Sequence, residues 1–242
     1  MHLHVSTAGA GARTALLVHG LFSDSTCWHR LVPALVERGY RVLTPDLRGH
    51  GASPRGRYSP TDWALDLIDT FAGERIDLAI GHSLGGLSLA IAEHGLDIGR
   101  VVHLDPAWRM TAEQAAAFRA EWTSWLSWTD PGQLRATLAA RWPDDDVQLR
   151  WASMWRTDPA VVAGLTDGGA YDHSPEAALR PSLVLAADPS EYITPEHTEE
   201  LRRRGLVVEV VAGSGHSWFR EDFPAFLRRV ESWAEEPVAA QG

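Results

Sequence analysis

The sequence predicts an α/β fold built around a mostly parallel β-sheet with helices on both faces. Two observations support this prediction, and a third indicates a segment inserted into it. Short β-rich runs alternate with helical segments through most of the chain, which is the pattern of a parallel sheet. A Gly-x-Ser-x-Gly pentapeptide at residues 81–85 joins an apolar run to a helical segment. Between two strands of the expected sheet, residues 106–181 contain no convincing strand.

In chain order, the β-rich runs predict about seven strands, near residues 2–6, 15–18, 41–45, 76–80, 100–104, 182–186 and 207–211. Helices are expected over residues 27–38, 59–72, 84–93, 195–203 and 221–234. Two of them have a proline in the first turn, Pro60 and Pro195, where its fixed φ suits the start of a helix. The short segment before the second strand leaves too little chain for a leading hairpin.

Length and composition indicate one compact domain, and neither a metal nor a cofactor is expected. The formal net charge of −10 disfavours nucleic acid and anionic membranes as partners, because both require clustered positive charge. Cys27 is the only cysteine, and all 22 basic residues are arginine, which excludes a Schiff-base or P-loop lysine. The chain has no apolar run long enough for a membrane span and no secretory leader, so a cytoplasmic location is expected.

The pentapeptide contains the candidate nucleophile, Ser83. Gly81 and Gly85 let the backbone turn sharply after the strand that ends near Ile80, which would hold the Ser83 hydroxyl clear of the sheet. The apolar residues that follow suit a buried helix. This strand–turn–helix context favours a nucleophile elbow over a glycine-rich turn without function.

Four motifs extend this interpretation over most of the chain. They are LLVHGLF at 16–22, PDLRGHGAS at 45–53, GHSLGG at 81–86 and GSGHS at 213–217. In order and spacing the chain resembles the α/β-hydrolase superfamily. The resemblance implies a serine nucleophile, a histidine base and a helical cap inserted between two strands of the core.

By this resemblance His216, in the Gly-Ser-Gly-His loop after the last strand, is the base. The acid that orients it has three candidates. Asp105 stands directly at a strand tip, whereas Asp188 and Glu191 follow the next strand, where most family members place the acid. We favour Asp105, although an Asp-Pro pair also initiates turns.

The oxyanion of the reaction intermediate needs two backbone N–H donors. Leu84, which follows the nucleophile, is one candidate, and Leu21 is the other, with Phe22 as the alternative. In the loop after the third strand, Asp46 and Arg48 are expected to form a structural ion pair.

The family resemblance divides the chain into a core, residues 1–105 and 181–242, and a Trp-rich cap, residues 106–180. Seven of the 11 tryptophans lie in the cap. Trp122 and Trp125, like Trp151 and Trp155, are spaced to share one helix face. These rings either tie the cap to the core or line an apolar substrate pocket, for which the candidates are Phe22, Trp108, Trp122, Trp125, Trp151 and Trp155.

The predicted function is therefore that of a serine hydrolase. It would cleave a small carboxylic ester, lactone or thioester with an apolar portion through an acyl-enzyme on Ser83. A carbon–carbon bond hydrolase of the same fold and a receptor-like module with little turnover are the alternatives. The sequence gives no indication of oligomeric state.

Overall fold

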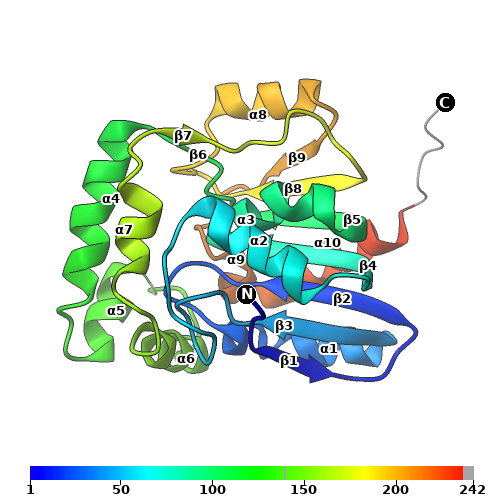
Figure 1. Ribbon diagram of the computed structural model, residues 1–242, viewed down its shortest axis with the longest axis horizontal. Coiled ribbons are helices and arrows are strands. Elements are labelled where there is room, and N and C mark those ends of the chain that lie inside the picture. Colours follow the sequence, from blue (N-terminus) through cyan, green and yellow to red (C-terminus); the bar gives the residue numbers. More distant parts are fainter. Residues whose placement is uncertain (139, 237–242) are drawn as a thin grey trace.

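A seven-stranded sheet forms the centre of the computed structural model, which describes residues 1–138 and 140–236 (Figure 1). The strand order is β1-β3-β2-β4-β5-β8-β9, and only β1 runs antiparallel to its neighbour. The strands are β1 (Val5–Ala8), β2 (Arg13–Val18), β3 (Tyr40–Pro45), β4 (Arg75–His82), β5 (Asp97–Leu104), β8 (Ser182–Ala186) and β9 (Val207–Val210). The prediction of a mostly parallel sheet of about seven strands is confirmed.

Helices cover both faces of this sheet (Figure 1). Alternate residues of β2 point to opposite faces, so Leu16 and Val18 belong to one hydrophobic cluster and Ala15 and Leu17 to the other. The first cluster includes residues of α2, α3 and α8, and the second includes residues of α1 and α10. These helices are α1 (Leu31–Glu37), α2 (Pro60–Thr70), α3 (Leu84–Ala92), α8 (Pro195–Arg203) and α10 (Phe223–Glu235), with the shorter α9 (Trp218–Glu221), η1 (Ser25–Trp28) and η2 (Glu93–Gly95) between elements.

Local capping explains where the two proline-led helices begin. The Ser59 side chain accepts a hydrogen bond from the backbone N–H of Asp62 at the start of α2, and Thr194 accepts one from His197 at the start of α8. Pro60 and Pro195 occupy the first turn, as the sequence predicts.

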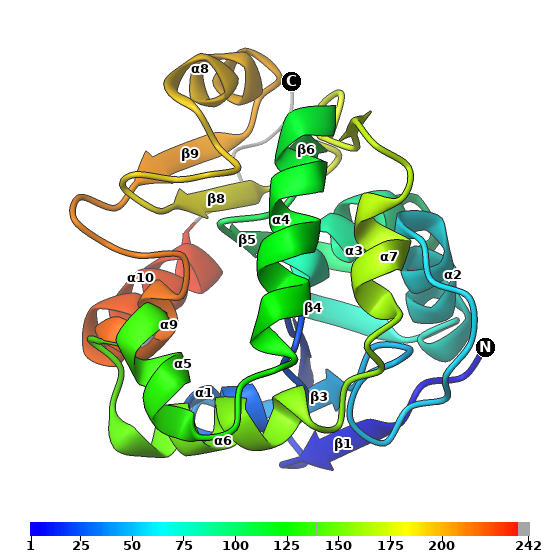
Figure 2. The same cartoon turned by 90° about the vertical axis from the view of Figure 1, so that its left-hand side faces the viewer.

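Residues 106–181, which follow Asp105 at the tip of β5 and lead to β8, are here called the insertion and lie beyond the carboxyl ends of the parallel strands. It contains α4 (Ala112–Trp125), α5 (Pro131–Thr137), α6 (Asp144–Met154) and α7 (Val161–Thr166), together with a two-residue pairing of β6 (Arg109–Met110) and β7 (Tyr171–Asp172) that the sequence does not predict. Figure 2 looks onto these helices, with α4 in front.

The buried residues of the insertion belong to the same hydrophobic cluster as α2 and α3. Residues 237–242, which the sequence assigns to the core, lie outside the described residues. Across the part of the chain that is described, every helix is too short or too polar to cross a lipid bilayer.

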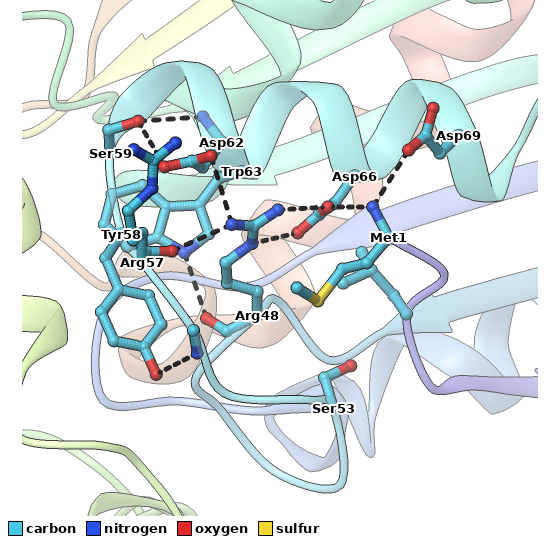
Figure 3. A network of polar contacts seen from close by, with 12 residues as sticks. Met1, Arg48, Ser53, Arg57, Tyr58, Ser59, Asp62, Trp63, Asp66 and Asp69 are labelled. Atoms are coloured by element: carbon cyan, nitrogen blue, oxygen red, sulfur yellow. Dashed lines mark hydrogen bonds and ion pairs between the residues drawn. The ribbon is translucent and has the colours of Figure 1, made fainter.

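The loop after β3 is fixed by an ion pair other than the expected one. Arg48 donates from Nε and Nη2 to both carboxylate oxygens of buried Asp66 on α2, at 2.6 Å each, and its Nη1 lies 3.2 Å from Asp62 (Figure 3). Asp46 instead accepts the backbone N–H of Ala52 at 2.9 Å, inside its own loop. The expectation of an Asp46–Arg48 pair is therefore wrong, because α2 brings a better-oriented carboxylate to the guanidinium.

Candidate active site

Ser83 occupies a strained turn between β4 and α3. Its backbone has φ 51° and ψ −114°, a conformation that a non-glycine residue adopts only when its surroundings impose it. A Cβ at Gly81 would lie 2.7 Å from the Gly85 carbonyl oxygen, and one at Gly85 would lie 2.2 Å from that of Val18. The two glycines of the pentapeptide are thus required by the close approach of β2, β4 and α3.

Asp105 and His216 meet at the carboxyl edge of the sheet. Asp105 Oδ2 lies 2.6 Å from His216 Nδ1, although the two residues are 111 positions apart in the chain. The other oxygen, Oδ1, accepts hydrogen bonds from the backbone N–H of Ala187 at 3.1 Å and from Ser190 Oγ at 2.6 Å. Both oxygens of this buried carboxylate are therefore held in place.

The other two candidate acids lie elsewhere. Asp188 is exposed and accepts a hydrogen bond from the backbone N–H of Gly213 at 3.3 Å, and Glu191 is also exposed. The loop that contains them instead supplies Ser190 to orient Asp105. Ser190 was not a sequence candidate, because a serine in a loop gives no signal of its partner.

His82, the residue before the nucleophile, supports the histidine loop. Its Nε2 donates to the backbone carbonyl of His216 at 3.0 Å, and the two rings pack at 4.6 Å. Burial and the neighbouring His216 hold the pKa of His82 well below its usual value. His82 therefore stays neutral as a structural donor.

Ser83 and His216 line the same cavity, although no hydrogen bond joins them among the described residues. Such bonds are often long in unliganded enzymes and shorten when substrate binds.

The candidate oxyanion donors flank Ser83. The backbone N–H of Leu84 is the first of α3, and those of Leu21 and Phe22 lie in the loop after β2. Within residues 1–138 and 140–236, none of the three donates to a protein acceptor. A helix N-terminus and a loop with free N–H groups both suit a developing negative charge.

His19 fixes the shape of this loop. Its Nδ1 donates to the carbonyl of Gly20 at 2.8 Å, and its Nε2 accepts the backbone N–H of Leu47 at 2.9 Å. Burial lowers the pKa of His19, and it also lowers that of His50, whose ring lies 5.0 Å away. The acceptor role of His19 Nε2 also requires a neutral ring.

The cavity above Ser83 has a volume of about 250 Å³ and lies between the sheet edge and the insertion. Its walls are largely aromatic and aliphatic: Leu21, Phe22, Trp122, Trp125, Leu138, Trp142, Leu165 and Tyr192. Trp142 and Tyr192 were not sequence candidates. Their positions depend on how α5, α6 and the loop after β8 turn toward the cavity.

Three candidate pocket residues do not line this cavity. Trp108 is fully buried, and its indole N–H donates to the carbonyl of Gly86 at 3.1 Å. Trp151 on α6 packs against Trp155, which directly follows that helix and is 58% exposed. The face of α6 that looks into the cavity carries Arg150 instead, because neighbouring residues of a helix point about 100° apart.

Two buried arginines line one side of the cavity. Arg220 donates to Asp146 at 2.9 Å, and its guanidinium packs on the Trp142 ring at 4.8 Å. Arg150 donates to the carbonyl of Leu21, next to the candidate oxyanion loop. Burial, with Arg220 nearby, lowers the pKa of Arg150 to about 9.

The described residues contain one group that could share a metal ion: His29, Asp145 and Asp146. Arg30 already pairs with both carboxylates, at 2.6 and 3.0 Å. Arg220 also pairs with Asp146, at 2.9 Å, so two guanidinium groups balance the two carboxylates that would attract a cation.

Comparisons with known proteins agree with this geometry. Residues 15–230 match the profile of the Alpha/beta hydrolase family. A pyrethroid hydrolase of Sphingobium wenxiniae is 38% identical over 87 residues, which cover 34% of this chain and 31% of that protein. Lipase LipV of Mycobacterium tuberculosis is 31% identical over 157 residues, or 60% of this chain and 57% of the lipase. The chain thus spans about a third to a half of these relatives' length.

The similarity in three dimensions extends over nearly the whole chain. The crystal structure of the enol-lactonase from Burkholderia xenovorans LB400 superimposes with a TM-score of 0.74 and 25% identity, covering 97% of this chain and 96% of that one. The sequence profile, the fold and the order of the motifs all indicate the same family. The chain belongs to the alpha/beta hydrolase family.

Proposed function

We propose that this protein is a serine hydrolase of small carboxylic esters, including lactones and thioesters, with an apolar portion. The observation that carries the proposal is the approach of Asp105 to His216, at 2.6 Å, where His216 lines the same aromatic cavity as the strained Ser83. The names of the relatives are consistent with it, because they include a pyrethroid hydrolase, a lipase and an enol-lactonase.

In the proposed mechanism His216 is the base. A carboxylate can only accept hydrogen bonds, so the proton between Asp105 and His216 resides on Nδ1 and leaves Nε2 with a lone pair. Nε2 takes the proton of Ser83 Oγ as the oxygen attacks the carbonyl carbon. Asp105 stabilises the imidazolium that forms, and Ser190 and Ala187 keep Asp105 oriented.

The free N–H groups of Leu84 and Leu21 receive the oxyanion of the tetrahedral intermediate. The imidazolium then protonates the leaving alcohol or thiol, which leaves an acyl group on Ser83. Water, deprotonated by His216, releases the acid and restores the hydroxyl of Ser83. Each bond formed to the acyl carbon is thus matched by one broken.

A fluorophosphonate probe tests the nucleophile directly. The wild-type protein should gain the mass of one phosphonyl group, and Ser83→Ala should gain none. An unlabelled wild-type protein would indicate the receptor-like alternative. A panel of p-nitrophenyl esters, lactones and acyl thioesters, assayed beside a diketone that is cleaved at a carbon–carbon bond, then compares the two reactions. The substrate class with the higher kcat/KM identifies the reaction.

A further inference from the structure

Arg150 is a buried cation whose partners in the protein are all neutral. Its residue is 9% exposed and lines the cavity. Nη1 donates to the carbonyl of Leu21 and to Ser23 Oγ, the latter at 2.9 Å. Nε is buried without a partner, and Nη2 donates to no acceptor among the described residues. Unlike Nε, the Nη2 atom is not fully enclosed by protein and retains accessible surface.

The other charged groups around this cavity are paired. Arg220 is bound to Asp146 at 2.9 Å, and Glu221 is paired with Arg141. Arg156 binds Asp24, an acid near Arg150, through Nε at 2.8 Å. Among the described residues that line the cavity, Arg150 is therefore the charged side chain without an oppositely charged partner.

A role in connecting α6 to the loop after β2 does not explain why residue 150 carries a positive charge. The hydrogen bonds to Leu21 and Ser23 could come from a neutral amide, whereas a buried guanidinium carries a large desolvation penalty when it is unpaired. The effect of burial on the Arg150 pKa, which falls to about 9, is consistent with that penalty. A buried charge of this kind on the wall of a cavity is compensated when a ligand supplies the counter-ion.

We propose that Arg150 binds a carboxylate of the substrate, so that the preferred substrates are esters or lactones that carry a second, free carboxylate group. This inference rests on the proposed function for the reaction and refines its substrate class. A carboxylate accepts the free N–H of Nη2 in a charge-assisted hydrogen bond, while the aromatic walls contact the carbon chain.

The geometry also restricts where that carboxylate lies. Arg150 holds the carbonyl of Leu21, and the N–H of the same residue is a candidate oxyanion donor. A substrate whose scissile carbonyl oxygen reaches Leu21 therefore has its carboxylate only a few bonds away. Half-esters of short dicarboxylic acids satisfy this spacing within a cavity of about 250 Å³.

Binding to the Ser83→Ala variant tests the proposal without turnover. Monomethyl glutarate and dimethyl glutarate differ in one carboxylate, and calorimetry at pH 7 compares their affinities. The half-ester should bind at least about 10-fold more tightly than the diester. Equal affinities would overturn the proposal, whatever the state of any Arg150 variant. A failure of the serine mechanism would appear separately, as absent fluorophosphonate labelling of the wild-type protein.

A second substitution in the Ser83→Ala background identifies the cation. Arg150→Gln retains an amide donor for Leu21 and Ser23 and should reduce the half-ester preference to near unity. Arg75→Gln removes the same charge from an exposed site, where Arg75 pairs with Asp97, and should retain the preference. If Arg150→Gln weakens both ligands equally, Arg150 only positions the loop, and the proposal is wrong.

Discussion

The loops at the carboxyl ends of the strands and the helices of the insertion contribute to one cavity in different ways. Ser83 and Asp105 directly follow β4 and β5, so the register of two paired strands fixes their separation. Arg150 and Trp125 lie on α6 and α4, and their positions depend on how each helix is rotated. The sheet edge thus holds the proposed reaction chemistry, and the insertion supplies the surfaces that select a substrate.

Removing the proposed nucleophile at the sheet edge should have the largest effect. Ser83→Ala should lower kcat for a p-nitrophenyl ester by about 10⁴- to 10⁶-fold, because the acyl-enzyme can no longer form. The cavity and its walls remain, so affinity for the half-ester should persist, and the circular dichroism spectrum should be unchanged. Retention of a tenth of the activity would exclude the serine mechanism.

The acid at the tip of β5 should rank next. Asp105→Asn should lower kcat by about 10³- to 10⁴-fold, because an amide at this position favours the wrong tautomer of His216. Asp188→Asn and Glu191→Gln are matched controls on exposed carboxylates and should retain most of the activity. A severe loss in either control, with Asp105→Asn active, would assign the acid to the loop after β8.

The contrast between the sheet edge and the insertion also explains which site residues could be predicted from the sequence. The motif around Ser83 and the strand ending at Leu104 are local patterns, and parallel pairing brings such strand ends together. Ser190 and Arg150 have no local pattern, since their significance comes from partners 85 and 129 positions away in the chain.

The tryptophans show the limit of helical spacing. A spacing of four residues correctly indicates that Trp151 and Trp155 share a face, and their rings do meet at 5.5 Å. The spacing does not indicate which face looks toward the cavity. On α4 the aromatic face does so, whereas on α6 the adjacent face does.

Within the insertion, the aromatic wall should have a smaller effect than the residues at the sheet edge. Trp125, whose ring packs 6.0 Å from that of Phe22, lines the cavity. Trp125→Ala should lower kcat/KM for a bulky phenylacetyl ester by about 10- to 100-fold and for a short acetyl ester much less. Trp155→Ala changes the same residue type on an exposed site and should leave this preference unaltered.

The measurement is the ratio of kcat/KM for the two esters, taken with the melting temperature of each variant. Trp125→Ala is expected to destabilise the fold as well, because it empties a buried site. A lower melting temperature with an unaltered ratio would show that the ring only joins the insertion to the core.

The smallest expected effect concerns stability at the sheet edge. His19, His50 and His82 are buried, and burial lowers the pKa of each below the value of about 6.5 expected in the unfolded chain. Between the lowered pKa and 6.5 the unfolded chain binds more protons than the folded chain. The free energy of unfolding should therefore fall as the pH decreases below about 6.5, by at most ~1.4 kcal/mol per pH unit for each histidine.

His50→Asn isolates one of these contributions. An asparagine amide can still donate to the carbonyl of Arg48, as His50 Nδ1 does at 3.1 Å, but it does not titrate. Chemical denaturation at pH 7.5 and 5.5 should give a smaller loss of stability for the variant than for the wild type. His94→Asn provides the comparison, because His94 lies in the exposed turn after α3. Identical pH dependence in wild type and His50→Asn would mean that His50 is protonated equally in the folded and unfolded chain, against the burial that its site imposes.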